Sequence, residues 1–92
     1  MIDFVPVAKL ISDGIKWTEQ PNEEKQHNAR FFVGVIQSWR FVVSSFDIED
    51  QGFQAGSRGY DGTAISNGII IRLLRVQAQM LVKDAIEKIY EQ

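Results

Sequence analysis

The chain has 92 residues, of which 45% are hydrophobic and 24% are charged, and this composition is typical of a small globular domain rather than of a disordered chain. Asp and Glu number 12 against 10 Lys and Arg, and the resulting net charge of −2 excludes a broadly basic protein that coats nucleic acid. The absence of cysteine excludes disulfides, thiolate metal sites and cysteine nucleophiles.

Neither the N-terminal residues nor the apolar stretches are typical of a secreted or membrane protein. Asp3 stands where a signal peptide carries basic residues, and no small-residue cleavage pattern follows it. The longest apolar-rich stretch, 31–46, contains Arg40 and is shorter than the roughly 20 apolar residues that a spanning helix needs. We therefore expect a cytoplasmic protein that makes no contact with a membrane.

Residues 3–17 are predicted to form a short amphipathic helix. Asp3 is suited to the N-cap, and Pro6 lies in the first turn, where its missing N–H costs little. Apolar side chains recur at helical spacing on one side of the segment, while Lys and Asp residues fall on the other side. This helix is expected to bury one face.

Residues 21–46 are predicted to form a second, long helix. Pro21 would stand in its first turn, followed by two glutamates that favour the positive end of the helix dipole. Aromatic and aliphatic residues from Phe31 to Phe46 recur at helical spacing along one side. The competing interpretation is a β-hairpin, because these residue types also favour strands, but its turn at Gln37-Ser38 lacks the Gly, Asn, Asp or Pro of tight turns.

Residues 63–90 are predicted to form a third helix, capped by Asp61 or Thr63. Its apolar side chains form two arcs with polar residues between them, so this helix needs packing partners on two sides. The alternative is a turn at Asn67-Gly68 that leads into a strand from residue 69 to 76.

Together these segments predict an all-α fold in one domain over residues 1–92. The short helix would lie across an antiparallel hairpin of two long helices, 21–46 and 63–90, joined by a Gly-rich loop over 47–62. The alternative is an α+β fold with strands within 30–48 and 69–76.

The Gly-rich loop 47–62 is the segment that most suggests ligand binding. Its glycines let backbone N–H groups turn toward an anion, directly ahead of the predicted third helix. Arg58 would add charged hydrogen bonds and Tyr60 a stacking face, with Gly59 and Thr63 beside them. The loop matches neither the P-loop nor the dinucleotide-binding pattern, so the expected ligand is only an anionic or nucleotide-like small molecule.

Metal binding and catalysis have little support in the residue pattern. The run from Asp47 to Gly52 resembles the start of a calcium loop, but Arg58 occupies the position that requires a bidentate Glu. The one histidine, His27, stands in a polar segment, and no Ser or acid is paired with it by a motif. We therefore expect no enzyme activity, no cofactor and no metal.

Two sets of residues are predicted to lie at interfaces. The first occupies the side of the second predicted helix away from its main apolar arc, where the small residues Gly34 and Ser38 allow close approach and Phe41 lies among them. The second forms a polar stripe on the third predicted helix, suited to salt bridges with a partner: Arg72, Arg75, Gln79 and Lys83. The small number of cations in an acidic chain argues against sustained contact with nucleic acid.

These observations predict a small helical interaction or assembly protein that acts by binding through its helical faces. A homo-oligomer or a complex with another protein is expected, because both long helices are apolar beyond one seam. An adaptor, a structural subunit or a phage-type or mobile-element inhibitor would fit this description. The alternative function is an oligomer that holds a small anionic ligand at the Gly-rich loop.

Overall fold

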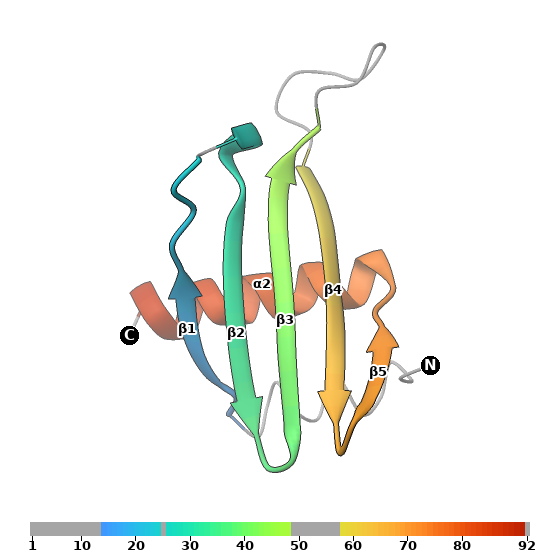
Figure 1. The fold of residues 1–92 in the computed structure, drawn as a ribbon. Helices are drawn as coiled ribbons and strands as arrows, with labels where there is room; N and C mark the ends of the chain where they lie inside the picture. Colours follow the sequence, from blue (N-terminus) through green and yellow to red (C-terminus); the bar gives the residue numbers. More distant parts are fainter. Residues whose placement is uncertain (1–13, 25, 49–57, 92) are drawn as a thin grey trace.

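Five antiparallel strands form one sheet, and an α-helix crosses one face of it (Figure 1). The computed structural model describes residues 14–24, 26–48 and 58–91. In chain order the elements are β1 (Lys16–Gln20), the 3-10 turn η1 (Gln26–Asn28), β2 (Arg30–Ile36), β3 (Trp39–Asp47), β4 (Arg58–Ser66), β5 (Ile69–Arg72) and α2 (Arg75–Tyr90). The strands lie side by side in this same order, so β1 and β5 are the two edges of the sheet.

The predicted all-α fold and its long helical hairpin are wrong. The segment 21–46 contains β2 and most of β3, and the segment 63–90 is helical only from Arg75 to Tyr90. Most of the predicted helix 3–17 lies outside the described residues, although its last two positions belong to β1. The strands that the alternative placed within 30–48 coincide with β2 and β3, whereas β1 and β4 were not foreseen.

The strand character of β2 and β3 was concealed because both faces of these strands carry apolar side chains. Phe32 and Phe41 are buried beneath α2, while their neighbours Phe31 and Val42 point to the opposite face of the sheet. Side chains alternate with a period of two along a strand. When both alternating sets are apolar, the period of two disappears from the sequence, and a helical arc fits the same residues.

Two-residue turns join β2 to β3 and β4 to β5. The first consists of Gln37 and Ser38 between Ile36 and Trp39, and Gln37 adopts a left-handed backbone conformation with φ 55°. The second consists of Asn67 and Gly68, at φ 51° and 81°, and it leads into β5. The Asn-Gly sequence is the preferred one for such a turn, whereas Gln37-Ser38 carries no such signal, and this is why the sequence favours a helix there.

The core lies between the sheet and α2. Phe32, Phe41 and Leu81 have no solvent exposure, and Val43 and Val82 are nearly as buried. At the start of the helix, the backbone N–H of Leu74 donates to the buried Gln77 side chain at 2.9 Å, so this polar group has a partner inside the core.

Gly34 allows β1 to approach β2 closely on the α2 side of the sheet. A Cβ atom at this position would stand 2.6 Å from both Ile15 Cγ2 and Trp17 Cζ3. The glycine therefore makes room for two apolar side chains that complete the core, and a larger residue would push them away.

Candidate functional site

The candidate site is the sheet face opposite α2, which we call the open face because none of the described elements covers it (Figure 1). The strand register arranges most of its side chains in three rows across the sheet: Gln20, Phe31, Ser44, Asp61; Thr18, Val33, Val42, Thr63, Arg72; and Lys16, Val35, Arg40, Ile65, Ile70. Beyond the first row, Phe46 lies on the same face opposite Gly59. Antiparallel strands hold these rows at fixed spacing, so the face is a rigid surface.

Apolar side chains occupy the middle of the open face. Phe31 is 36% exposed, Val42 38% and Val35 46%, and the half-buried Val33 lies among them. Strand β2 presents only apolar side chains on this side, although the water-facing side of an antiparallel sheet is ordinarily polar. This surface would gain free energy from being covered.

Charged side chains surround the apolar middle. Lys16 lies at one edge of the sheet and Arg72 at the other, and Arg40 interrupts the third row. The open face carries one acid, Asp61, against these three cations, so its formal charge is +2 while the whole chain carries −2. A partner with apolar side chains and some carboxylates would match this distribution.

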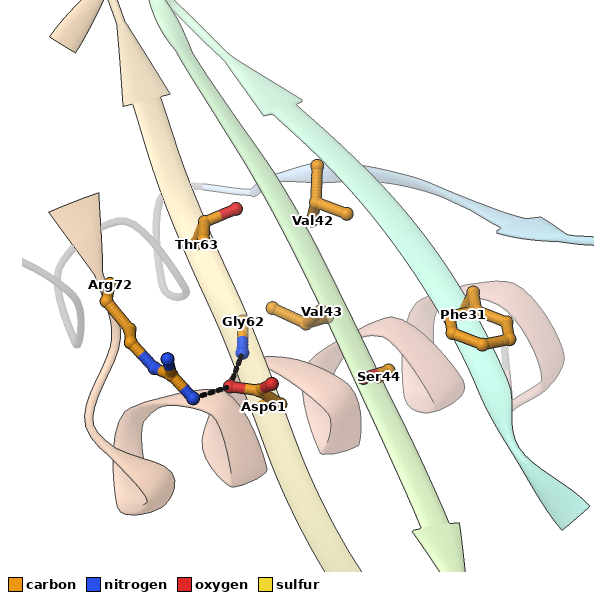
Figure 2. Close-up of a pocket in the computed structure, with 8 residues that line it drawn as sticks. All are labelled: Phe31, Val42, Val43, Ser44, Asp61, Gly62, Thr63 and Arg72. Atoms are coloured by element: carbon orange, nitrogen blue, oxygen red, sulfur yellow. Dashed lines mark hydrogen bonds and ion pairs between the residues drawn. The ribbon is translucent and has the colours of Figure 1, made fainter. Parts of the chain in front are cut away.

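A hollow on the open face lies between its first two rows, at the level of Phe31, Val42 and Thr63 (Figure 2). At its rim, Asp61 Oδ1 accepts a hydrogen bond from the backbone N–H of Gly62 at 3.0 Å and lies 3.5 Å from Arg72 Nη2. Both side chains of this ion pair are exposed, and solvent weakens their attraction, so both remain accessible to a partner.

The predicted ligand residue Arg58 is engaged by neighbouring protein groups. Its guanidinium donates to Asp47 Oδ1 at 2.6 Å and to Ser45 Oγ at 2.7 Å. Asn28 donates to the second oxygen of Asp47, also at 2.6 Å, and the hydrogen bonds from Asn28 and then Arg58 lower the pKa of Asp47. This cluster joins β3, β4 and η1 at one end of the sheet, so the Arg58 side chain already has the charged partner that an anion would offer.

The other predicted ligand residues do not converge around Arg58. Gly59 is buried against Phe46, and Tyr60 is half-buried with the Arg75 guanidinium 5.6 Å from its ring. Thr63 lies on the open face. Residues 49–57 of the Gly-rich loop and Glu49 of the calcium-like run lie outside the described residues, while 58–62 are part of β4 rather than of a loop.

The two predicted interface sets are also divided by the fold. Gly34 and Phe41 are buried on the α2 side, whereas Ser38 is exposed in a turn and its hydroxyl lies 2.9 Å from that of Ser66. Arg72 belongs to β5, but the other three residues of the polar stripe belong to α2. The four residues therefore do not form one continuous stripe, because that prediction required a single helix through all four positions.

Sequence reasoning missed a charged cluster that holds the end of α2 to the sheet. Arg30 donates two hydrogen bonds to Glu19, both at 2.9 Å, and Tyr90 at the end of α2 donates its hydroxyl to the same carboxylate. The Arg30 guanidinium also lies 5.3 Å from the Phe32 ring. The hydrogen bond that Arg30 donates lowers the pKa of Glu19. The hydrogen bond that Tyr90 donates to Glu19 raises the pKa of Tyr90.

The described residues offer neither a metal site nor a membrane-spanning helix. No group of three or more His, Cys, Asp or Glu side chains in this part of the chain is placed to hold a metal ion. Within the same part, α2 is too short and too polar to cross a membrane. His27 is exposed in η1 with a left-handed φ of 54°, and it lines a shallow hollow together with Phe31 and Phe46.

Comparison with known proteins adds no relative. No family model matches the chain, and no curated protein or solved structure shows significant similarity to it.

Proposed function

We propose that the protein is a non-catalytic interaction protein that binds another protein through its open face. The observation that carries this proposal is the exposed apolar middle of that face, formed by Phe31, Val35 and Val42. Contiguous apolar surface on a folded protein marks an interaction site more often than isolated apolar residues do. The sequence predicts binding through helical faces, but the surface that supports binding is a sheet face.

The layout of the open face supports binding of a protein rather than of a small molecule. An apolar centre with a polar rim is the usual anatomy of protein–protein interfaces, and Lys16, Arg40 and Arg72 supply rim charges. Their positive sign favours a partner surface with carboxylates around an apolar centre. A cytoplasmic location, and a role as adaptor, subunit or inhibitor, remain part of this proposal.

Rigidity of the sheet supports the same function. The residues beneath the open face, including Phe32, Phe41 and Val43, are buried and close-packed against α2. A preformed surface loses little conformational entropy on binding, so more of the contact free energy appears as affinity. Ligand binding at Arg58 receives no comparable support, since Asp47 and Ser45 already bind its guanidinium.

Site-specific photocrosslinking in cells of the source organism tests the proposal. A photoreactive phenylalanine analogue replaces Thr18, which is exposed on the open face, and in a matched control it replaces Lys83, which is exposed on α2. We expect a crosslinked protein from position 18 and none from position 83. Adding Val42→Asp should abolish the crosslink without unfolding the protein, because Val42 is already 38% exposed.

The opposite pattern, with crosslinks from position 83 and none from position 18, would overturn the proposal. A crosslink from position 18 that survives Val42→Asp would also contradict it, because the apolar middle would then contribute nothing to binding.

A further inference from the structure

Besides the open face, the outer edge of β5 has features of a binding surface. Among the described residues, two exposed large hydrophobic side chains lie in β5, Ile69 and Ile70, and a third, Leu74, lies two residues after the strand. Ile70 is 69% exposed and Ile69 60%, the two highest values among them. Among the described strands β5 pairs only with β4, and its sequence is three isoleucines followed by Arg72.

The other edge of the sheet is built differently. Strand β1 carries Lys16 and Glu19, and such charged residues are the common protection of edge strands against further pairing. Strand β5 carries no charge between Ile69 and Ile71, and isoleucine favours strand pairing. The edge at β5 is apolar and unprotected, whereas the opposite edge at β1 is protected by charges. This difference indicates that only β5 is adapted to receive another strand.

The backbone of β5 offers its outward hydrogen-bonding groups at Ile70. The N–H of Leu73 donates inward to the carbonyl of Gly62 at 2.9 Å. Inward and outward groups alternate along an antiparallel strand, so Ile69 and Ile71 direct theirs to β4. Ile70 therefore directs both its N–H and its C=O away from the sheet, at the centre of the three isoleucines.

We propose that β5 pairs with β5 of a second copy of this chain, antiparallel and about a two-fold axis that passes beside Ile70. This inference concerns the backbone edge of β5 rather than the apolar middle of the open face, and it does not depend on the function proposed for that face. In this register the two Ile70 residues exchange N–H and C=O hydrogen bonds, and Ile69 of each copy stands opposite Ile71 of the other.

Side-chain chemistry favours a second copy over an unrelated strand. Every directly opposed pair among the three isoleucines is apolar, and aliphatic pairs across strands are stabilising. Arg72 falls opposite Gly68 of the other copy, where it meets neither a like charge nor a bulky side chain. Because the axis is perpendicular to the sheet, both open faces would lie on the same side and form one surface of twice the extent.

The area of one short strand pair lies at the low end for specific interfaces, so we expect dissociation of the dimer on dilution. Sedimentation equilibrium over roughly two orders of magnitude in protein concentration measures this directly. We expect the wild-type mass to rise from the chain mass of 10.5 kDa to twice that value as concentration increases. A monomer throughout, or growth beyond the dimer, would overturn the proposal.

Charged variants at the symmetry axis give the sharper test. Ile70→Lys and Ile70→Glu should each be monomeric, because two like charges would face each other across the axis. An equimolar mixture of the two should dimerise again, because Lys then faces Glu. Each variant should remain folded by circular dichroism, since Ile70 is 69% exposed. Thr18→Lys on the protected edge is the matched control and should retain the wild-type mass.

Dimers of Ile70→Lys alone, or a mixture of the two charged variants that stays monomeric, would contradict pairing at Ile70. Neither result would decide the open-face proposal, because the crosslinking experiment reads Thr18 on β1, at the other edge of the sheet, and the apolar middle at Val42.

Discussion

The indole N–H of Trp17 donates a buried hydrogen bond to Asp84 Oδ2 at 2.8 Å, and this contact joins the first strand of the sheet to the middle of α2. The same carboxylate oxygen accepts from Lys88 Nζ at 2.9 Å, one helical turn further on. Asp84 is only 6% exposed, so its carboxylate depends on these two donors in place of water. The pair attaches the edge strand β1 to the helix.

Removing the indole donor should destabilise the fold. Trp17→Phe keeps an aromatic ring in the core but leaves the buried Asp84 carboxylate with one donor fewer. We expect a loss of about 1–3 kcal/mol in the free energy of unfolding, the usual cost of a buried polar group that lacks a hydrogen-bond partner. Urea denaturation measures this, with Lys83→Ala on the exposed side of the same helix as the control. A loss no larger than that of the control would show that the hydrogen bond is dispensable.

Replacing Gly34 should test the close approach of β1 and β2. In Gly34→Ala the new methyl group would stand 2.6 Å from Ile15 and Trp17 atoms, so these side chains must move. We expect a loss of about 1–3 kcal/mol, as for other overpacked cores. Val35→Ala, on the open face of the same strand, should cost clearly less when both are compared by urea denaturation. Equal losses for the two variants would argue against this packing.

Replacing Gln37 with a residue that adopts a left-handed backbone conformation more readily should stabilise the protein. Gln37 holds a φ of 55°, a left-handed conformation that asparagine adopts more readily. We expect Gln37→Asn to stabilise the protein by up to about 1 kcal/mol, and the reverse change Asn67→Gln to destabilise it by a similar amount. Thermal denaturation of the two variants measures both effects. A loss of stability in Gln37→Asn would contradict this account of the turn.

Acid should weaken the attachment of α2 through Glu19. The hydrogen bond from Arg30 lowers the pKa of Glu19 below its ordinary value of 4.5 in the folded state. A lowered folded-state pKa adds stability above the unfolded-state pKa, and that stability is lost as the pH falls through the folded-state pKa. The stability difference between wild type and Glu19→Gln should therefore be largest above pH 4.5 and shrink in more acid solution.

Urea denaturation of both proteins from neutral to acid pH measures this difference. Glu87→Gln is the matched control, because this glutamate is exposed on α2. A constant difference across the pH range would show that the Glu19 cluster contributes nothing that depends on its charge.

Local patterns in the sequence predicted some elements correctly. The helix from Arg75 to Tyr90 lies within the segment expected to be helical, and the Asn67-Gly68 turn was recognised as the start of an alternative strand. Both have local causes, because helical spacing and turn chemistry are properties of a few neighbouring residues. The prediction failed for β2 and β3, where an apolar open face removed the alternation that identifies a strand.

The candidate site was harder to predict than the fold. The sequence indicates Arg58 as a ligand residue because it lies among the glycines of the segment 47–62. Its partner Asp47 is on the neighbouring strand, and the position of Asp47 there depends on the β3–β4 register. The open face combines Phe31 and Val42 from one hairpin with side chains of β1, β4 and β5. No periodicity within one segment predicts which residues of different segments share a face.

By itself, the sequence determined that this is a mildly acidic, cysteine-free chain with more apolar surface than one helical seam can bury, and that a helix lies near its C-terminal end. Only the tertiary structure decided that the excess apolar residues lie on an open sheet face and on the β5 edge. The physical reason is that strand pairing joins backbone groups far apart in the chain. Its register, rather than any local preference, decides which side chains α2 covers and which remain exposed.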